Sequence, residues 1–210
     1  MCIIDLLLVN KKAKMKNRKI KLIVFTLMLI AVPSTVRAVA DTENTTINAN
    51  LGSTISITTS STVTINVTPV SGGSQSSASD TVTVATNNSS GYSLTLADSD
   101  ANTSLVNGGN TISAHTGTQA SPTALANNSW GYAVGGAGGF DASYSALSNV
   151  TSSASKWAGV PASGSANTLK TTSSTTSGDA TTVWYSVKAD TSKANGTYTD
   201  TVTYTATTNP

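Results

Sequence analysis

Residues 197–207 read TYTDTVTYTAT, with a threonine at every second position. Tyrosine, aspartate, valine and alanine occupy the positions between them. Successive side chains of an extended strand point to opposite faces, so a two-residue period predicts a β-strand. One face of this strand offers threonine hydroxyls to water, and the other, which is mostly apolar, points inward. The stretch therefore predicts a β protein with a hydroxyl-rich surface.

Shorter alternating runs occur upstream, separated by residues typical of turns. Residues 87–91 and the Asn195-Gly196 pair predict hairpin turns between consecutive strands. We expect an all-β fold, an immunoglobulin-like antiparallel β-sandwich. An up-and-down barrel or a β-helix is the alternative, although the absence of a fixed repeat counts against the β-helix. The predicted strands cover residues 55–57, 63–67, 81–84, 92–96, 129–134, 183–187 and 197–207.

Residues 140–181 are rich in Ser and Gly and have the weakest strand pattern. A long loop without structure of its own is unusual inside a compact domain. We therefore expect this stretch to fold back onto the sandwich as a cap, with Asp141 capping one helical turn that carries Tyr144 and Leu147. The residues expected to hold the cap are Phe140, Tyr144, Leu147, Trp157, Val160 and Leu169.

The amino terminus has the pattern of a secretory signal peptide. A basic stretch from Lys11 to Lys21 runs into an apolar segment at residues 22–32. Ala38 and Ala40 supply the small residues that signal peptidase requires, and we expect cleavage after Ala40 with Ala38 as a second candidate. An uncleaved anchor is the alternative.

The domain organisation follows from this signal pattern. Residues 1–40 form the signal segment, and Met15 is a more natural start for it than Met1. If translation starts at Met15, the only cysteine, Cys2, is absent from the exported protein, and no disulfide holds the fold. A polar lead-in at residues 41–50 then precedes one β-sandwich domain at residues 51–210.

The charge distribution excludes one class of partner. Eight of the twelve basic residues lie at or before Arg37, so residues 41–210 carry four basic and nine acidic side chains, a net charge of −5. Nucleic-acid binding needs a basic face, which this stretch lacks. Neutral polar residues dominate it, as is typical of an extracellular module. We expect a secreted or cell-surface protein that meets a membrane only through an uncleaved signal segment.

The order of several motifs resembles a known group of proteins. Residues 130–132 (WGY), 160–161 (VP), 183–187 (VWYSV) and the closing stretch 196–210 carry the resemblance. In this order of motifs, the sequence resembles secreted surface proteins of Saccharibacteria-like candidate-phylum bacteria. More loosely it is similar to WxL-type wall-binding domains and to fimbrial or spore-coat β-sandwich subunits. The resemblance implies an extracellular β-sandwich. The places of the two Trp-x-Leu motifs of peptidoglycan-binding WxL proteins would be residues 130–132 and 184–186, and neither has leucine.

The sequence predicts no catalytic site and no enzyme. His115 is the only histidine, and no cysteine occurs after Cys2. These residues cannot supply the usual zinc ligands. No Gly-x-Ser-x-Gly elbow accompanies the histidine, so we expect His115 to lie exposed in a loop rather than in a Ser-His-Asp triad.

Two weaker binding sites stay open. Asp98, Asp100 and Asn102 place side-chain oxygens at every second position, as a calcium-binding loop does, although these residues are also ordinary in turns. Trp157 and Trp184 are the candidates for half-exposed ligand contacts, for instance with sugar rings. The alternative is that they pack against the core, with residues 140–181 covering Trp184.

These observations favour a non-enzymatic protein with an adhesive or structural role at the bacterial envelope. Its expected partners are cell-surface or wall glycans, a host surface, or copies of itself. One alternative is a pilus or surface-layer subunit, in which the strand at residues 197–207 adds to a neighbour. Another is a carbohydrate-binding module that uses Trp157 or Trp184.

Overall fold

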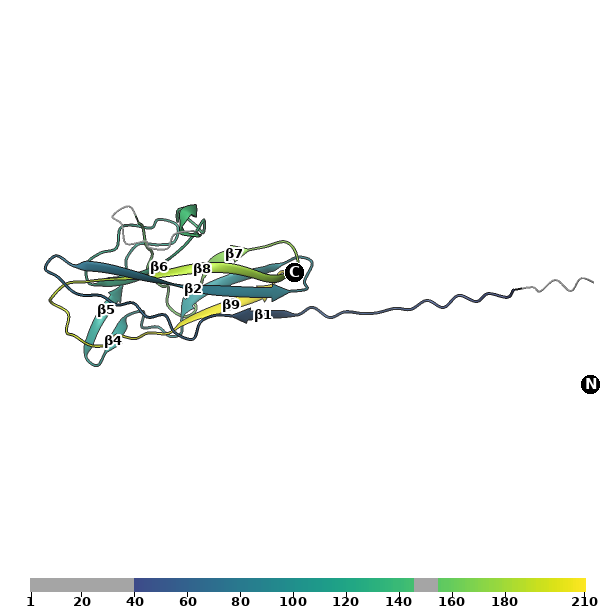
Figure 1. Cartoon of the computed structure of the whole chain (residues 1–210), viewed down its shortest axis with the longest axis horizontal. Helices are drawn as coiled ribbons and strands as arrows, with labels where there is room; N and C mark the ends of the chain where they lie inside the picture. The colour runs from purple at the N-terminus through teal and green to yellow at the C-terminus, as the bar shows by residue number, and fades with distance from the viewer. Residues whose placement is uncertain (1–39, 146–154) are drawn as a thin grey trace, which may run out of the picture. The chain divides into compact units, whose positions relative to one another are not determined.

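The computed structural model describes residues 40–145 and 155–210. The chain divides into two compact units, Met1–Asn48 and Ala49–Pro210. The second unit is a sandwich of two β-sheets (Figure 1), which confirms the predicted all-β class. Residues 1–39, with the predicted start at Met15 and the cleavage residue Ala38, lie outside the described residues.

The larger sheet has six strands in the order β1-β2-β8-β6-β5-β4. Its two longest strands, β2 and β8, form an antiparallel pair. Strands β5 and β6 run parallel to each other, and the other pairs are antiparallel. The strands are β1 (Ile55–Thr58), β2 (Ser74–Thr86), β4 (Leu105–Asn107), β5 (Asn110–Ala114), β6 (Ser129–Val134) and β8 (Thr176–Ala189).

The smaller sheet has three antiparallel strands in the order β7-β3-β9. They are β7 (Asn167–Thr171), β3 (Tyr92–Asp98) and β9 (Val202–Thr208). The threonines at alternate positions from 197 to 207 are all exposed, and the residues between them are half-buried. The two-faced character of this stretch is therefore as predicted, but the strand is shorter than predicted, because residues 197–201 precede β9 and only Thr199 forms a bridge. β9 is an edge strand of its sheet.

Both predicted hairpins are wrong, because each turn joins strands of different sheets. The turn at residues 87–91 leads from β2 to β3, and the stretch around residues 195–196 leads from β8 to β9. Turn residues reverse the chain locally, but both edges of β2 are already occupied by β1 and β8. A hairpin does join β4 to β5 through Gly108 and Gly109, and the φ of 57° at Gly108 suits a two-residue turn of this kind.

Residues 140–145 and 155–160 pack against the core as predicted for the cap. The later part of the expected cap is different, because residues 167–171 form β7 and residues 176–181 begin β8. A single 3-10 turn, η1 (Ala142–Ser145), begins where the Ser143 N–H donates to Asp141 Oδ1 at 2.8 Å. Edge-to-face contacts join consecutive rings with centroids 5.5, 6.1 and 5.7 Å apart. Leu147 lies outside the described residues. The rings in contact are those of Tyr132, Phe140, Tyr144 and Trp157.

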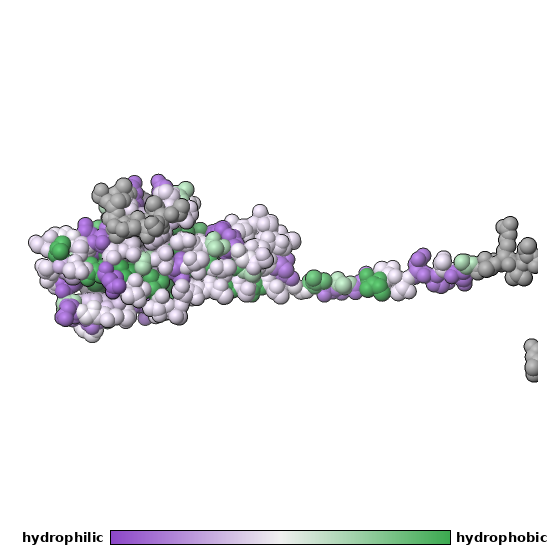
Figure 2. Space-filling view, in the orientation of Figure 1, coloured by the Kyte–Doolittle hydropathy of each residue, from purple (hydrophilic) through white to green (hydrophobic). Residues whose placement is uncertain are grey.

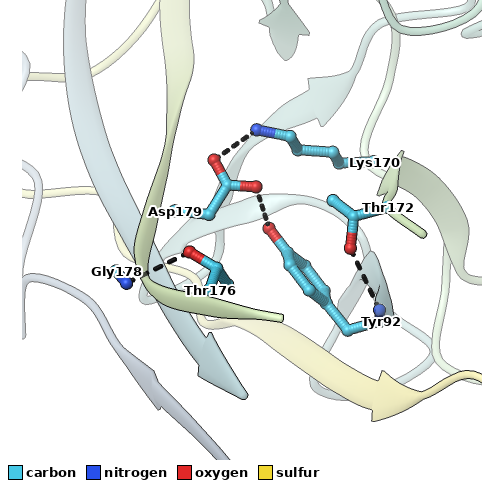
Figure 3. Close-up of polar contacts among 6 residues, drawn as sticks. All are labelled: Tyr92, Lys170, Thr172, Thr176, Gly178 and Asp179. Carbon is cyan, nitrogen blue, oxygen red and sulfur yellow. Dashed lines mark hydrogen bonds and ion pairs between the residues drawn. The ribbon is translucent and has the colours of Figure 1, made fainter. Parts of the chain in front are cut away.

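Polar contacts close the sandwich on the β7 side (Figure 3). Asp179 on β8 accepts from Lys170 Nζ on β7 at 2.6 Å and from the Tyr92 hydroxyl on β3 at 2.8 Å. The Tyr92 N–H in turn donates to Thr172 Oγ1 at 3.1 Å. We call these four residues the closed flank, because they link the two sheets through groups of the chain itself.

Candidate functional site

A groove of about 820 Å³ opens beside β9, at the other edge of the small sheet from β7. Residues 59–69, which follow β1, form its first wall. Residues 193–204, which lead into β9 and include its first residues, form its second wall. Apolar residues gather between β2 and β4 on an otherwise mostly polar surface (Figure 2). The floor consists of Leu105, Ile112, Trp130, Tyr185, Val187 and Ala189.

The first wall is not a strand, so the strand predicted at residues 63–67 is wrong. Burial does follow the predicted alternation, with half-buried apolar residues and exposed polar residues between them. A strand also needs a partner for its N–H and C=O groups. Within the described part of the chain, residues 61–67 make no hydrogen bond. The backbone of the first wall is therefore open to a partner.

A buried carboxylate holds the beginning of the first wall. Asp80 on β2 is only 3% exposed and lies in the groove. Its Oδ1 accepts from the Ser60 N–H at 3.0 Å, and its Oδ2 accepts from the Thr59 hydroxyl. A buried charge is costly unless it is hydrogen-bonded. These bonds therefore stabilise the charge and fix the point at which the first wall leaves β1.

Two contacts hold the second wall against the larger sheet. Thr199 exchanges backbone hydrogen bonds of 2.9 and 3.0 Å with Val106 on β4. The hydroxyls of Tyr204 on β9 and Tyr185 on β8 lie 2.6 Å apart, which ties this wall to the floor. Burial raises the pKa of both tyrosines, so both stay neutral at physiological pH. The outer edge of β9 has no partner strand in the described chain.

Half-buried apolar side chains concentrate at this groove. Nine such residues pack against the core, and seven of them line the groove. Each leaves apolar surface in water, and covering it is worth about 25 cal/mol per Å². Two open backbone edges above an apolar floor suit an extended peptide. The seven residues are Val63, Ile65, Val67, Leu105, Tyr198, Val202 and Tyr204.

A pair of carboxyl groups lies beside the groove. Asp200 is in the second wall and interacts with Asp98 at the end of β3. The Oδ2 atoms of both are buried, and neither accepts an N–H or O–H from the described residues. Burial, followed by the charges of Asp98 and Asp100, raises the pKa of Asp200 to about 6. A proton held by Asp200 can therefore link the two carboxyls.

The predicted calcium ligands serve as turn residues. Asp98 Oδ1 accepts from the Asp100 N–H at 3.0 Å, and Asp100 Oδ1 accepts from the Asn102 N–H at 2.6 Å. Asn102 Oδ1 accepts from the Ser104 N–H at 3.3 Å. Residues 40–145 and 155–210 contain no group of three or more His, Cys, Asp or Glu suited to a metal ion. The turn interpretation thus accounts for one side-chain oxygen of each residue, and the calcium interpretation gains no support.

The two tryptophans predicted as ligand contacts are not available for stacking. Trp157 is 0% exposed and Trp184 is 5% exposed. The indole N–H of Trp184 donates to the Tyr144 carbonyl at 2.7 Å, so the capping segment covers it. A sugar ring stacks on an exposed ring face, and neither indole offers one. The prediction of half-exposed contacts is wrong, and the packing alternative is confirmed.

His115 is also buried, contrary to the prediction of an exposed loop residue. Its Nε2 lies 2.8 Å from the Thr123 hydroxyl, and its Nδ1 accepts from the Ala126 N–H at 3.4 Å. Burial lowers its pKa, which keeps the ring neutral. These partners hold the ring in place and include no carboxylate, so the triad geometry is missing at this histidine.

Comparison with protein-family models, with curated proteins and with solved structures finds no match to this chain. Within the described ranges, no helix has the length and apolar character needed to span a membrane.

Sequence reasoning missed the groove, although one signal for it was present. The alternation at residues 63–67 predicts a half-buried extended segment correctly, but it says nothing about pairing. Whether such a segment finds a partner depends on the strands that the fold brings beside it.

Proposed function

We propose that this chain is an exported, non-enzymatic structural subunit of the bacterial surface, which joins neighbouring chains by accepting a strand in its groove. The groove carries this proposal, because it combines open backbone edges with an apolar floor. β-Strand addition uses both features, since main-chain hydrogen bonds supply affinity and side-chain pockets supply specificity. The proposed compartment rests on the signal pattern at residues 1–40 and on the neutral polar composition.

The composition of the first wall supports strand addition. Monomeric proteins usually protect an open edge with charged residues, prolines or bulges. Residues 59–68 contain no charged residue and no proline, and the only proline of the first wall is Pro69 at its end. An unprotected edge of this kind invites pairing. The carbohydrate-binding alternative has less support, because Trp157 and Trp184 are buried.

The test is the size of the exported protein, expressed from its full coding sequence, over a range of concentrations. Light scattering should show larger species as concentration rises, and Ile65→Asp in the first wall should shift their formation to at least tenfold higher concentration. Ile57→Asp is the matched control, since Ile57 is 37% exposed and does not line the groove. It should assemble like the wild type.

Val202→Asp in the second wall tests the same surface from the other side, and a thermal melt verifies that each variant is folded. Immunogold electron microscopy of intact cells adds the location. Label along filaments or in a lattice supports a structural subunit. A protein that stays monomeric at every concentration, with label only in the medium, contradicts the proposal.

A further inference from the structure

The segment before β1 has the pattern of a strand without a sheet. Residues 40–54 are exposed and contain no regular secondary structure. Ile47 and Leu51 are 83% and 85% exposed, the highest values among the exposed large apolar residues of the described chain. Single exposed apolar residues are common. Here, however, Ile47, Ala49 and Leu51 alternate with polar residues, so in an extended conformation they lie on one face.

We infer that residues 45–52 of one copy, the donor segment, insert as a strand into the groove of a second copy. This inference rests on the proposed function and names the partner of the same groove. The apolar face of the donor segment matches the apolar floor in chemistry. Its backbone can pair with the first wall and with the free edge of β9. The donor segment contains no charged residue and no proline, so every residue can contribute to a ladder.

Hydrogen bonds at the start of β1 favour a second copy over the same copy. The Thr54 N–H donates to Asn87 Oδ1 at 2.7 Å, and Asn87 Nδ2 donates to the Gly52 carbonyl at 2.9 Å. These bonds continue the β1–β2 pairing toward the amino terminus. The chain therefore enters β1 at its Ile55 end, whereas the groove begins beyond Thr58 at the other end.

A hairpin turn just before β1 would not bring the donor segment to the groove of its own copy. A hairpin centred on Ser53 would bring Leu51 opposite Ile55 and Ile47 opposite Thr59. The unpaired part of the first wall, residues 61–67, would remain empty. The donor segment of a second copy can reach this part without such a restriction. Donor and groove are different surfaces of the chain, so a joined pair leaves one groove and one donor segment free, and further copies can add at both ends.

The test uses two variants of the full chain, alone and mixed. The donor variant carries Ile47→Asp and Leu51→Asp, and the groove variant carries Ile65→Asp. Each alone should need at least a tenfold higher concentration than the wild type to assemble. Mixed in equal amounts they should form a dimer with one copy of each and stop there. The donor variant keeps its groove, and the groove variant keeps its donor segment.

The matched control carries Asn48→Asp and Asn50→Asp, which add the same charge to the other face of the donor segment. It should assemble like the wild type. A fluorescent peptide of residues 41–54 should bind the donor variant and not the groove variant, as measured by anisotropy. Val202→Asp replaces the groove variant if Ile65→Asp does not fold.

The outcomes separate this inference from the proposed function. If the groove variant blocks assembly while the donor variant assembles like the wild type, the inference is overturned and the proposed function stands. If neither variant changes assembly, both fail. A mixture that stays monomeric overturns the inference. A fourth outcome is a monomeric wild type that does not bind the peptide, together with a donor variant that does. This result would show that the donor segment fills the groove of its own copy, and it would also overturn the inference.

Discussion

The two flanks of the sandwich satisfy their polar and apolar groups in different ways. On the closed flank, Asp179 receives hydrogen bonds from Lys170 and Tyr92, and β7 covers the edge of β3. On the groove side, the first wall has an unpaired backbone and β9 has a free outer edge. Both flanks contain extended chain with alternating side chains. They differ in whether the chain itself supplies the partner.

The two flanks should differ in what they stabilise, a single folded copy or an assembly of copies. Contacts within the chain contribute to the free energy of unfolding of a single copy. Open backbone edges and half-buried apolar residues contribute less to one copy and more to an assembly of copies. We therefore expect substitutions on the closed flank to change stability, and substitutions at the groove to change association more than stability.

The largest expected effect comes from the core beside the closed flank. Leu94 is fully buried and pairs with Lys170 across β3 and β7. Leu94→Ala should lower the free energy of unfolding by about 3 kcal/mol, because it leaves a cavity. Ile65→Ala at the half-buried first wall should cost about 1 kcal/mol. Urea denaturation at low protein concentration measures both, and equal losses would contradict the comparison.

The attachment of the first wall should depend on Asp80. Asp80→Ala leaves the Ser60 N–H and the Thr59 hydroxyl without their acceptor. It should therefore lower the free energy of unfolding by about 2 kcal/mol. Hydrogen exchange at residues 59–68 should become faster while exchange in β2 and β8 stays slow. Asp141→Ala, which removes an exposed carboxylate elsewhere, is the control. Unchanged exchange at the first wall would show that Asp80 does not hold it.

The carboxyl pair beside the groove should make stability fall with rising pH. The pKa of Asp200 is raised to about 6 in the folded chain, compared with about 3.9 when unfolded. The folded state therefore binds the proton more strongly, and stability is lost as pH rises from about 4 through 6. Asp200→Asn should remove this dependence and stabilise the chain by about 1 kcal/mol at pH 7, since partial exposure weakens the effect.

Denaturation measured across this pH range checks the sign. The expectation is contradicted if the free energy of unfolding of the wild type rises between pH 4 and 6 and does not differ from that of Asp200→Asn.

The closed flank should show the smallest effect, with the opposite sign. Burial raises the pKa of Asp179, but hydrogen bonds from Lys170 and Tyr92 outweigh it and hold the pKa below its usual value. The contribution of the Asp179 carboxylate to the free energy of unfolding is present above about pH 4 and is lost as pH falls through the pKa of the folded state. Lys170→Met should cost about 0.5 kcal/mol at pH 7, because the pair is partly exposed.

Lys156→Met provides the control for removal of a positive charge. The difference between Lys170→Met and the wild type should shrink below pH 4, where Asp179 becomes protonated. A difference that persists in acid would assign the effect to packing of the lysine stem instead of the ion pair.

Local patterns were sufficient for much of the fold. The strand predicted at residues 129–134 has the bounds of β6, and the threonine stretch presents its two faces as expected. Asp141 begins a short helical turn that carries Tyr144. These features depend on a two-residue side-chain period or on a cap within a few residues. The Gly108-Gly109 hairpin between β4 and β5 was missed, although its turn signal is also local.

The candidate site could not be predicted in the same way. Asp98, Asp100 and Asn102 have the spacing of ligands, but their oxygens accept from neighbouring backbone groups. Burial of Trp157 and Trp184 depends on where the capping segment folds. The groove exists because two stretches more than a hundred residues apart line it together, and no pattern within either stretch reports that meeting.

By itself, the sequence determined that the chain is a β protein with alternating faces, where its turns lie and which segment caps it, because side-chain period and turn chemistry act over a few residues. The tertiary structure decided which strands share a sheet and which edges stay open. The turn at residues 87–91 and the stretch around 195–196 both cross between sheets, and residues 61–67 remain unpaired. Strand pairing brings together groups far apart in the chain, and the whole fold determines which of them meet.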